Sequence, residues 1–459
     1  MSLTSRGRSV VAAVVVVGAV SATMSMRAAE HEGTVTFNRD VLPVLQKNCQ
    51  SCHRPGDIAP MSFLTYKDTR PWARAMKTAV TSRQMPPWFA DPAYGHFAND
   101  KRLSDADIQT IAAWADGGAT EGDAKDKPAP VVFQEGWGLK PDMVIEMPKD
   151  VDLPANGTIN YKYILVKANF PEDRWVVAAD LRPGNPEAVH HMRAIVRPPG
   201  SDWMKNAEYG VAYEQGDKSM GRQADGTDLL GKFNPGLGAQ DFSEFESAKF
   251  VPKGSDIVFN MHYTATGKPA TDRSRLALVF AKQPPKLRYF THDGPTAFNL
   301  AIPPNEGRVE VVSEMTATAD TQLVYLQPHM HLRGKDYEVR LIYPSGKTET
   351  VFKAKWDFNW QLGYDFAEPV AIPKGTRIIG IAHFDNSTAN KFNPDPNKTV
   401  FWGPQNWEEM QNCFMSFLID PNLKDPRTLF RPSGPSLLPR GASGPSLASL
   451  TGPSASSAP

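Results

Sequence analysis

The run Cys49-Gln50-Ser51-Cys52-His53 constrains this chain more than any other feature, because two thiols stand one helical turn apart with a histidine directly after them. In this C-x-x-C-H spacing both sulfurs can form thioethers to the vinyl groups of one porphyrin, and the histidine then lies under the iron. A chance pentapeptide and a disulfide pair are the alternatives. The motif predicts a covalent c-type haem on Cys49 and Cys52, with His53 as proximal ligand.

The N-terminus has the order of a secretory signal peptide. Two arginines precede an apolar run from Val10 to Val20, and small residues follow up to Ala29. The run is short for a membrane span, which needs about 20 apolar residues, although an uncleaved N-terminal anchor is the alternative. We therefore expect a signal peptide over residues 1–29, no membrane span in the mature chain, and a periplasmic location, where covalent haem attachment takes place.

Charge and cysteine content exclude some classes of protein. Lysine and arginine together number 50 against 50 aspartates and glutamates, with no basic run, so nothing suggests a nucleic-acid partner. The 459 residues suffice for about three domains. If the haem takes two of the three cysteines, Cys413 has no partner and no intrachain disulfide is possible. Stability must then come from core burial, bound metals and the haem.

Residues 34–122 are predicted to form a small all-α domain with the size and helix order of a monohaem cytochrome c. An apolar run precedes the haem motif, and a second helix begins near Pro71. A third helix is expected to begin at the capping residue Ser104 and to end at Gly117.

The iron of such a haem needs a sixth ligand, and methionine is the usual soft donor. Met85 comes about 30 residues after His53, and the two prolines that follow it fix the backbone. Met61 comes much sooner, which gives a short reach around the porphyrin edge. We predict Met85 as the ligand and keep Met61 as the alternative.

Beyond a polar, proline-containing linker at 123–130, short strand-like runs alternate with glycine and proline turns, as is typical of β-sandwiches. A repeat divides this region. A Pro-Lys-Gly turn leads to His262 and a second one leads to His383, and in both copies an aromatic residue follows the histidine. We predict two related all-β, jelly-roll-like sandwiches over 131–284 and 285–425.

The end of the chain, residues 430–459, is rich in serine, glycine and proline, with Gly-Pro-Ser recurring three times. Such a tail buries too little apolar surface to offset its chain entropy, so we expect it to be disordered.

Five of the ten histidines fall into patterns that suit metal ions. His329 and His331 form an H-x-H, which puts both imidazoles on one face of a strand. His262 lies in an alternating strand pattern. The adjacent His190 and His191 would face opposite sides of a regular strand, so joint ligation requires a bulge or another irregularity. The alternative for any lone histidine is a hydrogen-bonded core residue.

These motifs resemble the copper type II, ascorbate-dependent monooxygenases, the family of dopamine β-monooxygenase and peptidylglycine α-hydroxylating monooxygenase. The resemblance covers roughly residues 140–425. Four motifs carry it, in order: His190-His191-Met192, Asn260-Met261-His262-Tyr263, His329-Met330-His331 and Glu408-Glu409-Met410. It implies two copper ions, an electron-storing ion held by the first three histidines and an ion that meets O2. The ligands of the second ion would be His329, His331 and Met410.

The implied ligands suit copper. Imidazole accommodates both oxidation states of the ion, and the thioether of Met410 is a soft donor that favours Cu(I). Met415 competes for this role from the same segment and is expected in the core. His383 is left open as a ligand, a supporting group or a relic of the repeat.

The chain departs from the family at several positions. Peptide-amidating members carry an arginine two residues before the H-x-H, which grips the carboxylate of the substrate, and Gln327 stands there in this chain. Asn412 matches the family, but Phe414 replaces a tyrosine. The animal enzymes depend on disulfides and ascorbate, whereas this chain lacks the cysteines and brings its own haem domain.

The sequence thus predicts a periplasmic copper monooxygenase with a haem domain as its electron port. Its expected partners are an external electron donor, O2 and a small-molecule substrate with a C–H bond to hydroxylate. The alternative is an electron-transfer or copper-binding protein without oxygenase activity. A structural zinc or sugar-binding sandwich is less favoured, because Met410 is a poor zinc ligand.

Overall fold

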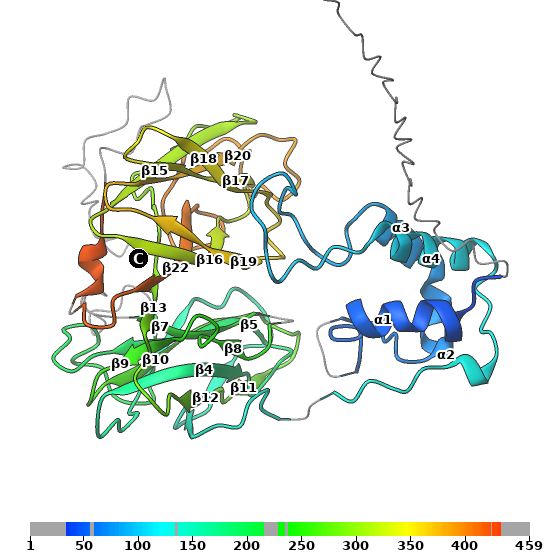
Figure 1. Cartoon of the computed structure of the whole chain (residues 1–459), viewed down its shortest axis with the longest axis horizontal. Helices are drawn as coiled ribbons and strands as arrows, with labels where there is room; N and C mark the ends of the chain where they lie inside the picture. Colours follow the sequence, from blue (N-terminus) through cyan, green and yellow to red (C-terminus); the bar gives the residue numbers. More distant parts are fainter. Residues whose placement is uncertain are drawn as a thin grey trace, which may run out of the picture.

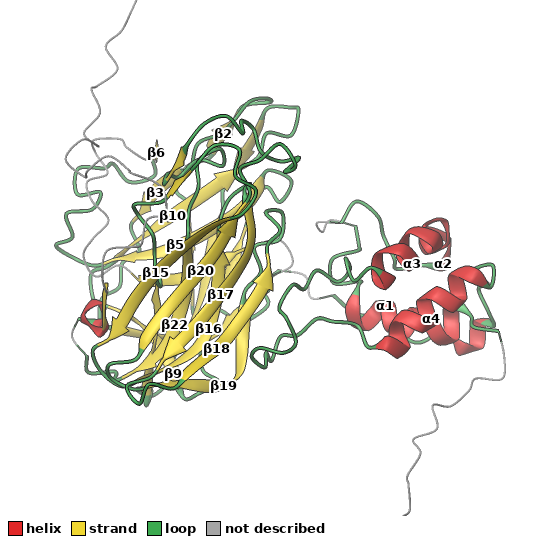
Figure 2. Ribbon diagram, turned by 90° about the horizontal axis from the view of Figure 1, so that it is seen from above, coloured by secondary structure: helices red, strands yellow, loops and turns green. Residues whose placement is uncertain are grey.

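The computed structural model describes residues 34–55, 59–133, 136–214, 228–234, 237–423 and 425–432. The protein is multidomain and mostly β, with a few helices at the N-terminal side (Figures 1 and 2). The predicted signal peptide and residues 433–459 of the predicted tail lie outside the described residues. The first three residues of that tail, Phe430–Pro432, form a strand paired with Met315–Ala317, so the ordered part of the chain extends beyond the predicted start of the tail. Within the described residues, no helix has the length and apolarity that crossing a membrane requires.

The helical unit forms largely from the segments that the sequence predicts as helices, but it also contains a short helix, Tyr66–Thr69, that was not predicted. Its α-helices are α1 (Leu42–Asn48), α2 (Tyr66–Thr69), α3 (Ala73–Thr81) and α4 (Asp105–Asp116). The hydroxyl of Ser104 accepts the backbone N–H of Asp107, and α4 ends at Asp116, which confirms the predicted boundaries. Short turns precede α1 and α3 at Phe37–Val41 and Arg70–Trp72, and another, Ala124–Asp126, lies in the linker. The core of this unit includes Ile111 and Trp114, both fully buried.

The segment between α3 and α4 leaves the helical unit and packs against the second β unit (Figure 1). We call its residues 88–99 the strap. Trp88 is buried in the core of the second β unit, and Ala90 and Phe97 form isolated bridges with Ala354 and Phe366. The strap therefore attaches the helical unit to that β unit by backbone bonds and aromatic packing.

The β part consists of two units, each with its own apolar core. The strands of the first unit are β1 (Met143–Glu146), β2 (Val151–Leu153), β3 (Lys162–Val166), β4 (Arg174–Arg182), β5 (Val189–Arg197), β6 (Ala212–Glu214), β7 (Asp228–Phe233), β8 (Gln240–Asp241), β9 (Ser247–Val251), β10 (Asp256–Tyr263), β11 (Ala270–Asp272) and β12 (Arg275–Phe280). The strands of the second unit are β13 (Leu287–His292), β14 (Ala301–Ile302), β15 (Val309–Ala317), β16 (Thr321–His329), β17 (Gly334–Ile342), β18 (Thr348–Lys355), β19 (Tyr364–Ile372), β20 (Arg377–Phe384), β21 (Val400–Phe401), β22 (Asn412–Ile419) and β23 (Phe430–Pro432).

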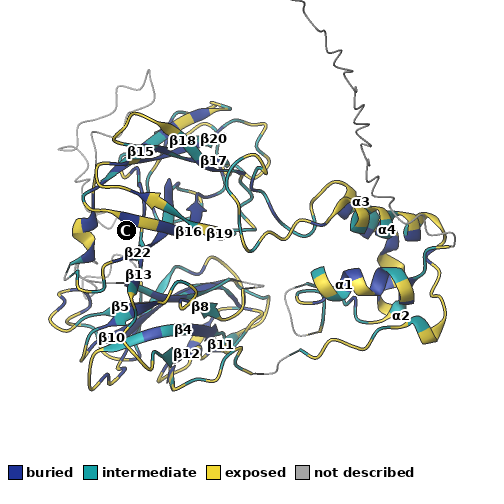
Figure 3. Cartoon of the chain, viewed as in Figure 1, coloured by how far each residue is buried: buried dark blue, intermediate teal, exposed yellow. Residues whose placement is uncertain are grey.

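The strands form four layers (Figure 1). In the first unit the sheet β6-β3-β10-β5-β7 packs on β1-β12-β4-β9, and in the second unit β18-β17-β20-β15-β23 packs on β13-β22-β16-β19. Buried residues lie along the strands of the paired layers (Figure 3), and their apolar side chains form the two cores. Parallel pairing of β9 with β13 joins the two units into one continuous nine-stranded sheet, so main-chain hydrogen bonds hold the units together.

The sequence repeat marks the same place in both units. Its two turns connect β9 to β10 and β19 to β20, and Gly254 and Gly375 take the positive φ angles, 75° and 88°, that these turns need. His262 and His383 then lie on β10 and β20, each the middle strand of a five-stranded sheet.

Candidate metal centres

The structure brings His190, His191 and His262 together on one face of the sheet β6-β3-β10-β5-β7. One ligating nitrogen of each residue lies within 4.8 Å of the other two, a spacing that one metal ion can span. His262 Nδ1 lies 2.9 Å from His191 Nε2, so these two rings share a hydrogen bond that a metal ion would replace. We call these three residues the first cluster.

A β-bulge makes the first cluster possible. His262 pairs with His191, but the next residue, Tyr263, pairs with Val189, which leaves His190 as an extra residue on β5. The extra residue breaks the strict alternation of side chains, so neighbours can turn to one face of the sheet. This irregularity is the one that the adjacent histidines require for joint ligation.

His329 and His331 form the second cluster at the end of β16, with ring centroids 5.2 Å apart. Both side chains are buried. His329 Nδ1 lies 2.8 Å from Gln361 Oε1, and His331 Nδ1 lies 3.2 Å from the carbonyl oxygen of Glu408. Both partners are acceptors, so each imidazole carries its proton on Nδ1 and keeps the Nε2 lone pair for a metal ion.

A buried carboxylate supports the second cluster from behind. Glu409 is fully buried, and its two oxygens accept the backbone N–H groups of His331, at 2.7 Å, and of Arg333, at 2.6 Å. The two bonds fix the chain that carries His331 to the segment that carries Met410.

Met410 stands two residues before β22, just outside the ladder that this strand forms with β16. β16 and β22 are antiparallel, with His329 opposite Asn412. Continued by two residues, the same register puts Met410 opposite His331, and residues directly opposite each other point to the same face. Met410 is half-buried, and its role as a third donor to the second cluster stays a prediction.

Burial keeps the imidazoles of both clusters neutral. It lowers the pKa of His262 to about 3 and that of His331 to about 4. Burial also lowers the pKa of His190, and it lowers those of His191 and His329 well below the ordinary value. Neutral imidazole is the form that binds metal ions, so both clusters are ready for ligation near pH 7.

The two clusters face each other across the interface between the β units, where β5 and β10 lie opposite β16 and β22 (Figure 1). The guanidinium of Arg193, two residues after His191, lies 4.3 Å from the ring centroid of Phe414 on β22. That ring lies 6.1 Å from the ring of His329. The clusters are close enough that His329 contributes to the lowered pKa of His191.

A hydrogen-bonded chain connects the first β unit to the support of His329. Lys232 on β7 donates to Tyr325 and, at 3.0 Å, to Gln327 Oε1. Gln327 Nε2 donates to the carbonyl of Gln361 at 2.7 Å, and the side chain of Gln361 accepts from His329. The sequence contains no signal for this chain, because it depends on which strands meet at the interface.

The C-x-x-C-H motif forms a single turn directly after α1. The N–H groups of Cys52 and His53 both donate to the carbonyl of Cys49, at 3.1 and 2.9 Å. Both thiols are free and partly exposed. The imidazole of His53 stacks on Phe63 at 4.3 Å, and burial lowers its pKa. His53 Nδ1 is buried and has no hydrogen-bond partner among the described residues. Two reachable thiols beside a neutral imidazole are compatible with covalent haem attachment.

The two candidate sixth ligands differ in their surroundings. Met61 packs on the apolar core of the helical unit together with Cys49, and its backbone hydrogen-bonds the side chain of His53. Met85 lies after α3, where its N–H donates to the carbonyl of Ala79 at 3.2 Å. It leads through two prolines into the strap. Ligation by Met85 stays a prediction.

The remaining candidates lie apart from the clusters. Met415 is fully buried in the core of the second β unit. His383 Nδ1 lies 2.6 Å from Asp336 Oδ1, and its Nε2 lies 3.4 Å from Glu310, both on neighbouring strands of the outer sheet. His383 therefore has carboxylate partners of its own.

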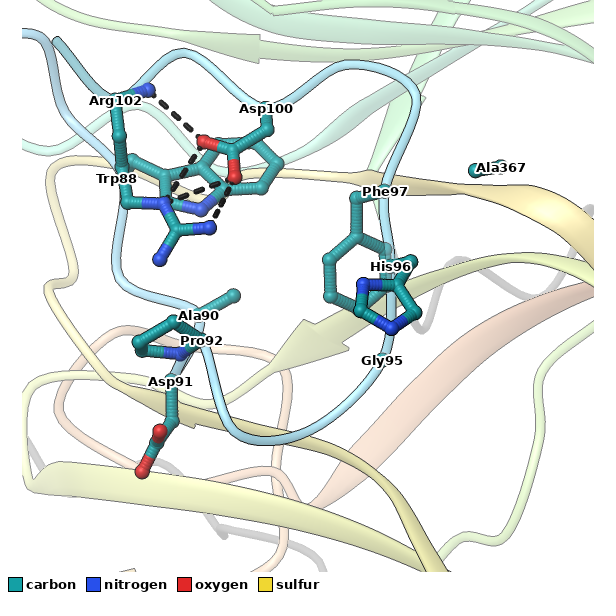
Figure 4. Close-up of a pocket in the computed structure, with 10 residues that line it drawn as sticks. All are labelled: Trp88, Ala90, Asp91, Pro92, Gly95, His96, Phe97, Asp100, Arg102 and Ala367. Atoms are coloured by element: carbon teal, nitrogen blue, oxygen red, sulfur yellow. Dashed lines mark hydrogen bonds and ion pairs between the residues drawn. The ribbon is translucent and has the colours of Figure 1, made fainter. Parts of the chain in front are cut away.

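The strap borders a small cavity of about 140 Å³. Its lining includes Trp88, His96, Phe97 and the ion pair of Asp100 with Arg102 (Figure 4). Residues of the two histidine clusters do not line it, so this cavity is separate from the candidate metal centres.

Comparison with protein-family models and with curated proteins finds no match. Among solved structures, PNGF-II has a TM-score of 0.25 and 12% identity, with coverage of 70% of this chain and 71% of that one. A structure of the infectious bursal disease virus Gx strain has a TM-score of 0.17 and 9% identity, with coverage of 66% and 78%. Likenesses this weak carry no argument about fold or function.

Proposed function

We propose that this protein is a periplasmic copper-dependent monooxygenase that hydroxylates a C–H bond of a small molecule with O2 and receives electrons through a c-type haem domain. The observation that carries the proposal is the pair of histidine clusters facing each other across one interface. Three imidazoles form the first cluster and two form the second, to which we assign the thioether of Met410 as the third donor.

The donor sets suit two different tasks. Imidazoles alone accommodate both oxidation states of copper, as an electron store requires. The thioether of Met410 favours Cu(I), as an ion that meets O2 requires. Copper at the two clusters and haem at the helical unit would supply electron storage, O2 activation and electron relay. The overall reaction consumes the substrate, O2, two electrons and two protons, and yields the alcohol and water.

The residues of the chain have supporting roles in this proposal. Gln361 and the carbonyl of Glu408 accept the Nδ1 protons of the second cluster, which leaves the Nε2 lone pairs for a metal ion. The jelly-roll-like topology and the cytochrome-like character of the helical unit belong to the same proposal.

The strap supports the role of the helical unit as an electron port. Trp88 lies edge-on to Tyr364, with centroids 4.8 Å apart, and Tyr364 pairs with Leu326 on the strand that ends at His329. The predicted haem ligand Met85 is thus three residues from an aromatic contact with the unit that carries the second cluster.

Isotope labelling tests the proposal. Purified protein with measured iron and copper contents would be supplied with a reductant, labelled O2 and an extract of periplasmic small molecules. We expect a product that gains one labelled oxygen atom, substrate-dependent O2 uptake, and loss of both in Met410→His with copper content retained. If every extract fraction gives water as the only product that carries oxygen from the labelled O2, the oxygenase assignment is overturned.

One observation favours the second candidate, an electron-transfer or copper-binding protein. His329 and His331 are only 5% and 2% exposed, which restricts access for a substrate. Redox cycling of haem and copper without O2 uptake in the same experiment would select this candidate.

A further inference from the structure

A row of polar side chains crosses the face of the sheet that carries the first cluster. Asn260 lies directly opposite Tyr163 on one side and Arg193 on the other, and Arg193 lies opposite Lys232. Residues opposite each other in antiparallel strands share a face. Arg193 and Asn260 each stand two residues from a histidine of the first cluster, so the row borders that cluster on its own face.

Arg193 has unused hydrogen-bonding capacity. Its guanidinium stacks on Phe414 of the other β unit, and it forms no hydrogen bond or ion pair with the residues that the structure describes. A guanidinium that stacks on a ring leaves its five N–H donors free at its edge, where they match the geometry of a carboxylate.

Two amide groups nearby also lack partners. Asn260 is 4% exposed and its Nδ2 has no hydrogen-bond acceptor within the described chain, and Asn412, 7% exposed, has an unpartnered Oδ1. Buried polar groups in native proteins are nearly always satisfied by protein, water or a ligand. Asn260 is the cross-strand neighbour of Arg193, so a single acceptor group can satisfy both.

The charges of the interface favour an anion as that acceptor. Lys232 is held by Tyr325 and Gln327 and is attracted by the half-buried Asp365, whereas Arg193 has no carboxylate partner among the described residues. Both clusters offer only neutral donors, so bound metal ions would add further positive charge. Arg193 is half-buried, and a positive charge withdrawn from water without a counter-charge is unfavourable, so an anion at Arg193 removes part of that cost.

We propose that Arg193 and Asn260 form a binding site for a small carboxylate between the two histidine clusters, and that the substrate carries this group. The site itself is independent of the reaction, whereas its use for substrate rests on the proposed function. The anchor would lie on the first β unit, across the interface from Gln327.

Calorimetric titration of the full mature protein with acetate tests the site, in metal-free protein and in protein loaded anaerobically with Cu(I). We expect saturable binding of acetate and at least tenfold weaker binding of the neutral isostere acetamide. Arg193→Gln should weaken acetate binding at least tenfold. Asn260→Asp should abolish binding, because its own carboxylate would occupy Arg193. The matched control is Arg275→Gln, which removes a guanidinium stacked on Trp137 at 5.6 Å in the same β unit and should leave acetate binding unchanged.

Three outcomes overturn the site: no saturable acetate binding, equal binding of acetamide, or full binding in folded Arg193→Gln and Asn260→Asp. The substrate assignment has a separate arm, in which labelled oxygen from O2 should enter carboxylate-bearing products. Labelled products that are all uncharged or cationic overturn the substrate assignment. Absence of every labelled product is a failure of the proposed function, which the acetate titration in metal-free protein does not depend on.

Discussion

The two histidine clusters are built in different ways. The first arises within one sheet, from two neighbouring strands and a bulge, and its rings contact one another and Tyr161. The second stands at a strand end, where Gln361, Glu408 and Glu409 hold its imidazoles and their backbone from outside. The first therefore depends on strand register, and the second depends on a scaffold drawn from distant segments.

This difference has consequences for stability and for metal binding. Register is fixed by the cores of the β units, so the first cluster should tolerate changes in its surroundings. The scaffold of the second cluster includes buried polar groups, whose loss is costly. Changes in that scaffold should affect the second cluster while leaving the first unaltered.

Removal of a ligand gives the largest expected effect. His191→Ala should weaken copper binding at the first cluster by more than about 100-fold, since supporting residues alone account for 10- to 100-fold. The second cluster should keep its ion. Competitive titration with a Cu(I) chelator measures both affinities. His383→Ala removes the repeat-related histidine and should leave two ions bound. If both variants keep the same copper content, the first cluster is misassigned.

Acid should destabilise the metal-free protein through both clusters. The folded state holds the pKa of all five imidazoles below the ordinary value, so between pH 6.5 and about 4 the unfolded chain binds protons that the native chain does not. Stability is therefore lost as the pH falls through this window. Each imidazole that stays neutral at pH 5.0 costs about 2 kcal/mol of stability relative to pH 7.5, so urea unfolding should show a loss at pH 5.0, which the raised pKa of Glu409, about 8, partly offsets. A flat profile would contradict the buried, neutral state of the imidazoles.

A substitution of Glu409 tests how much the scaffold of the second cluster contributes to stability. Glu409→Gln keeps the size of the side chain but replaces one accepting oxygen by an amide nitrogen, which cannot accept a backbone N–H. One of the two bonds to His331 and Arg333 is lost, at a cost of about 1–3 kcal/mol. Urea unfolding measures this loss. The control is Glu368→Gln, which makes the same change on the exposed surface of β19 and should change stability by less than about 0.5 kcal/mol.

The smallest expected effect on copper affinity comes from a contact between the two β units, the hydrogen bond from Lys232 to Gln327. Lys232→Met removes the donor to Gln327 and loosens Gln361, so copper affinity at the second cluster should fall several-fold while the first stays unchanged. Lys162→Met, which breaks only the surface pair with Glu214, serves as the control. Equal losses at both clusters would show that Lys232 acts on the whole interface.

Local patterns in the sequence predicted much of the fold and singled out the histidines that the structure brings together in two clusters. The helix from Ser104, the H-x-H strand and the need for a bulge at His190 all follow from spacing of two to four residues. The repeat turns at Gly254 and Gly375 mark equivalent places because the same strand pair follows each turn.

The supports could not be predicted, because they depend on how distant strands meet. Arg193 reaches Phe414, and Lys232 reaches Gln327, only because β5 and β7 face β16 and β22. The packing of the strap against the second β unit could not be predicted from the sequence either. Its residues lie within the predicted helical domain at 34–122, yet Trp88 packs in the second β unit.

X-ray absorption at the copper edge tests the central claim most directly, that two clusters of different donors bind two copper ions. Fully loaded, reduced wild-type protein should hold about two copper ions per chain. Only one of the two ions should have a sulfur neighbour, so the average is one sulfur per two copper ions. Met410→Leu should lose the sulfur signal and keep the imidazole signal. A single ion per chain, or a sulfur neighbour that persists in Met410→Leu, would contradict the account.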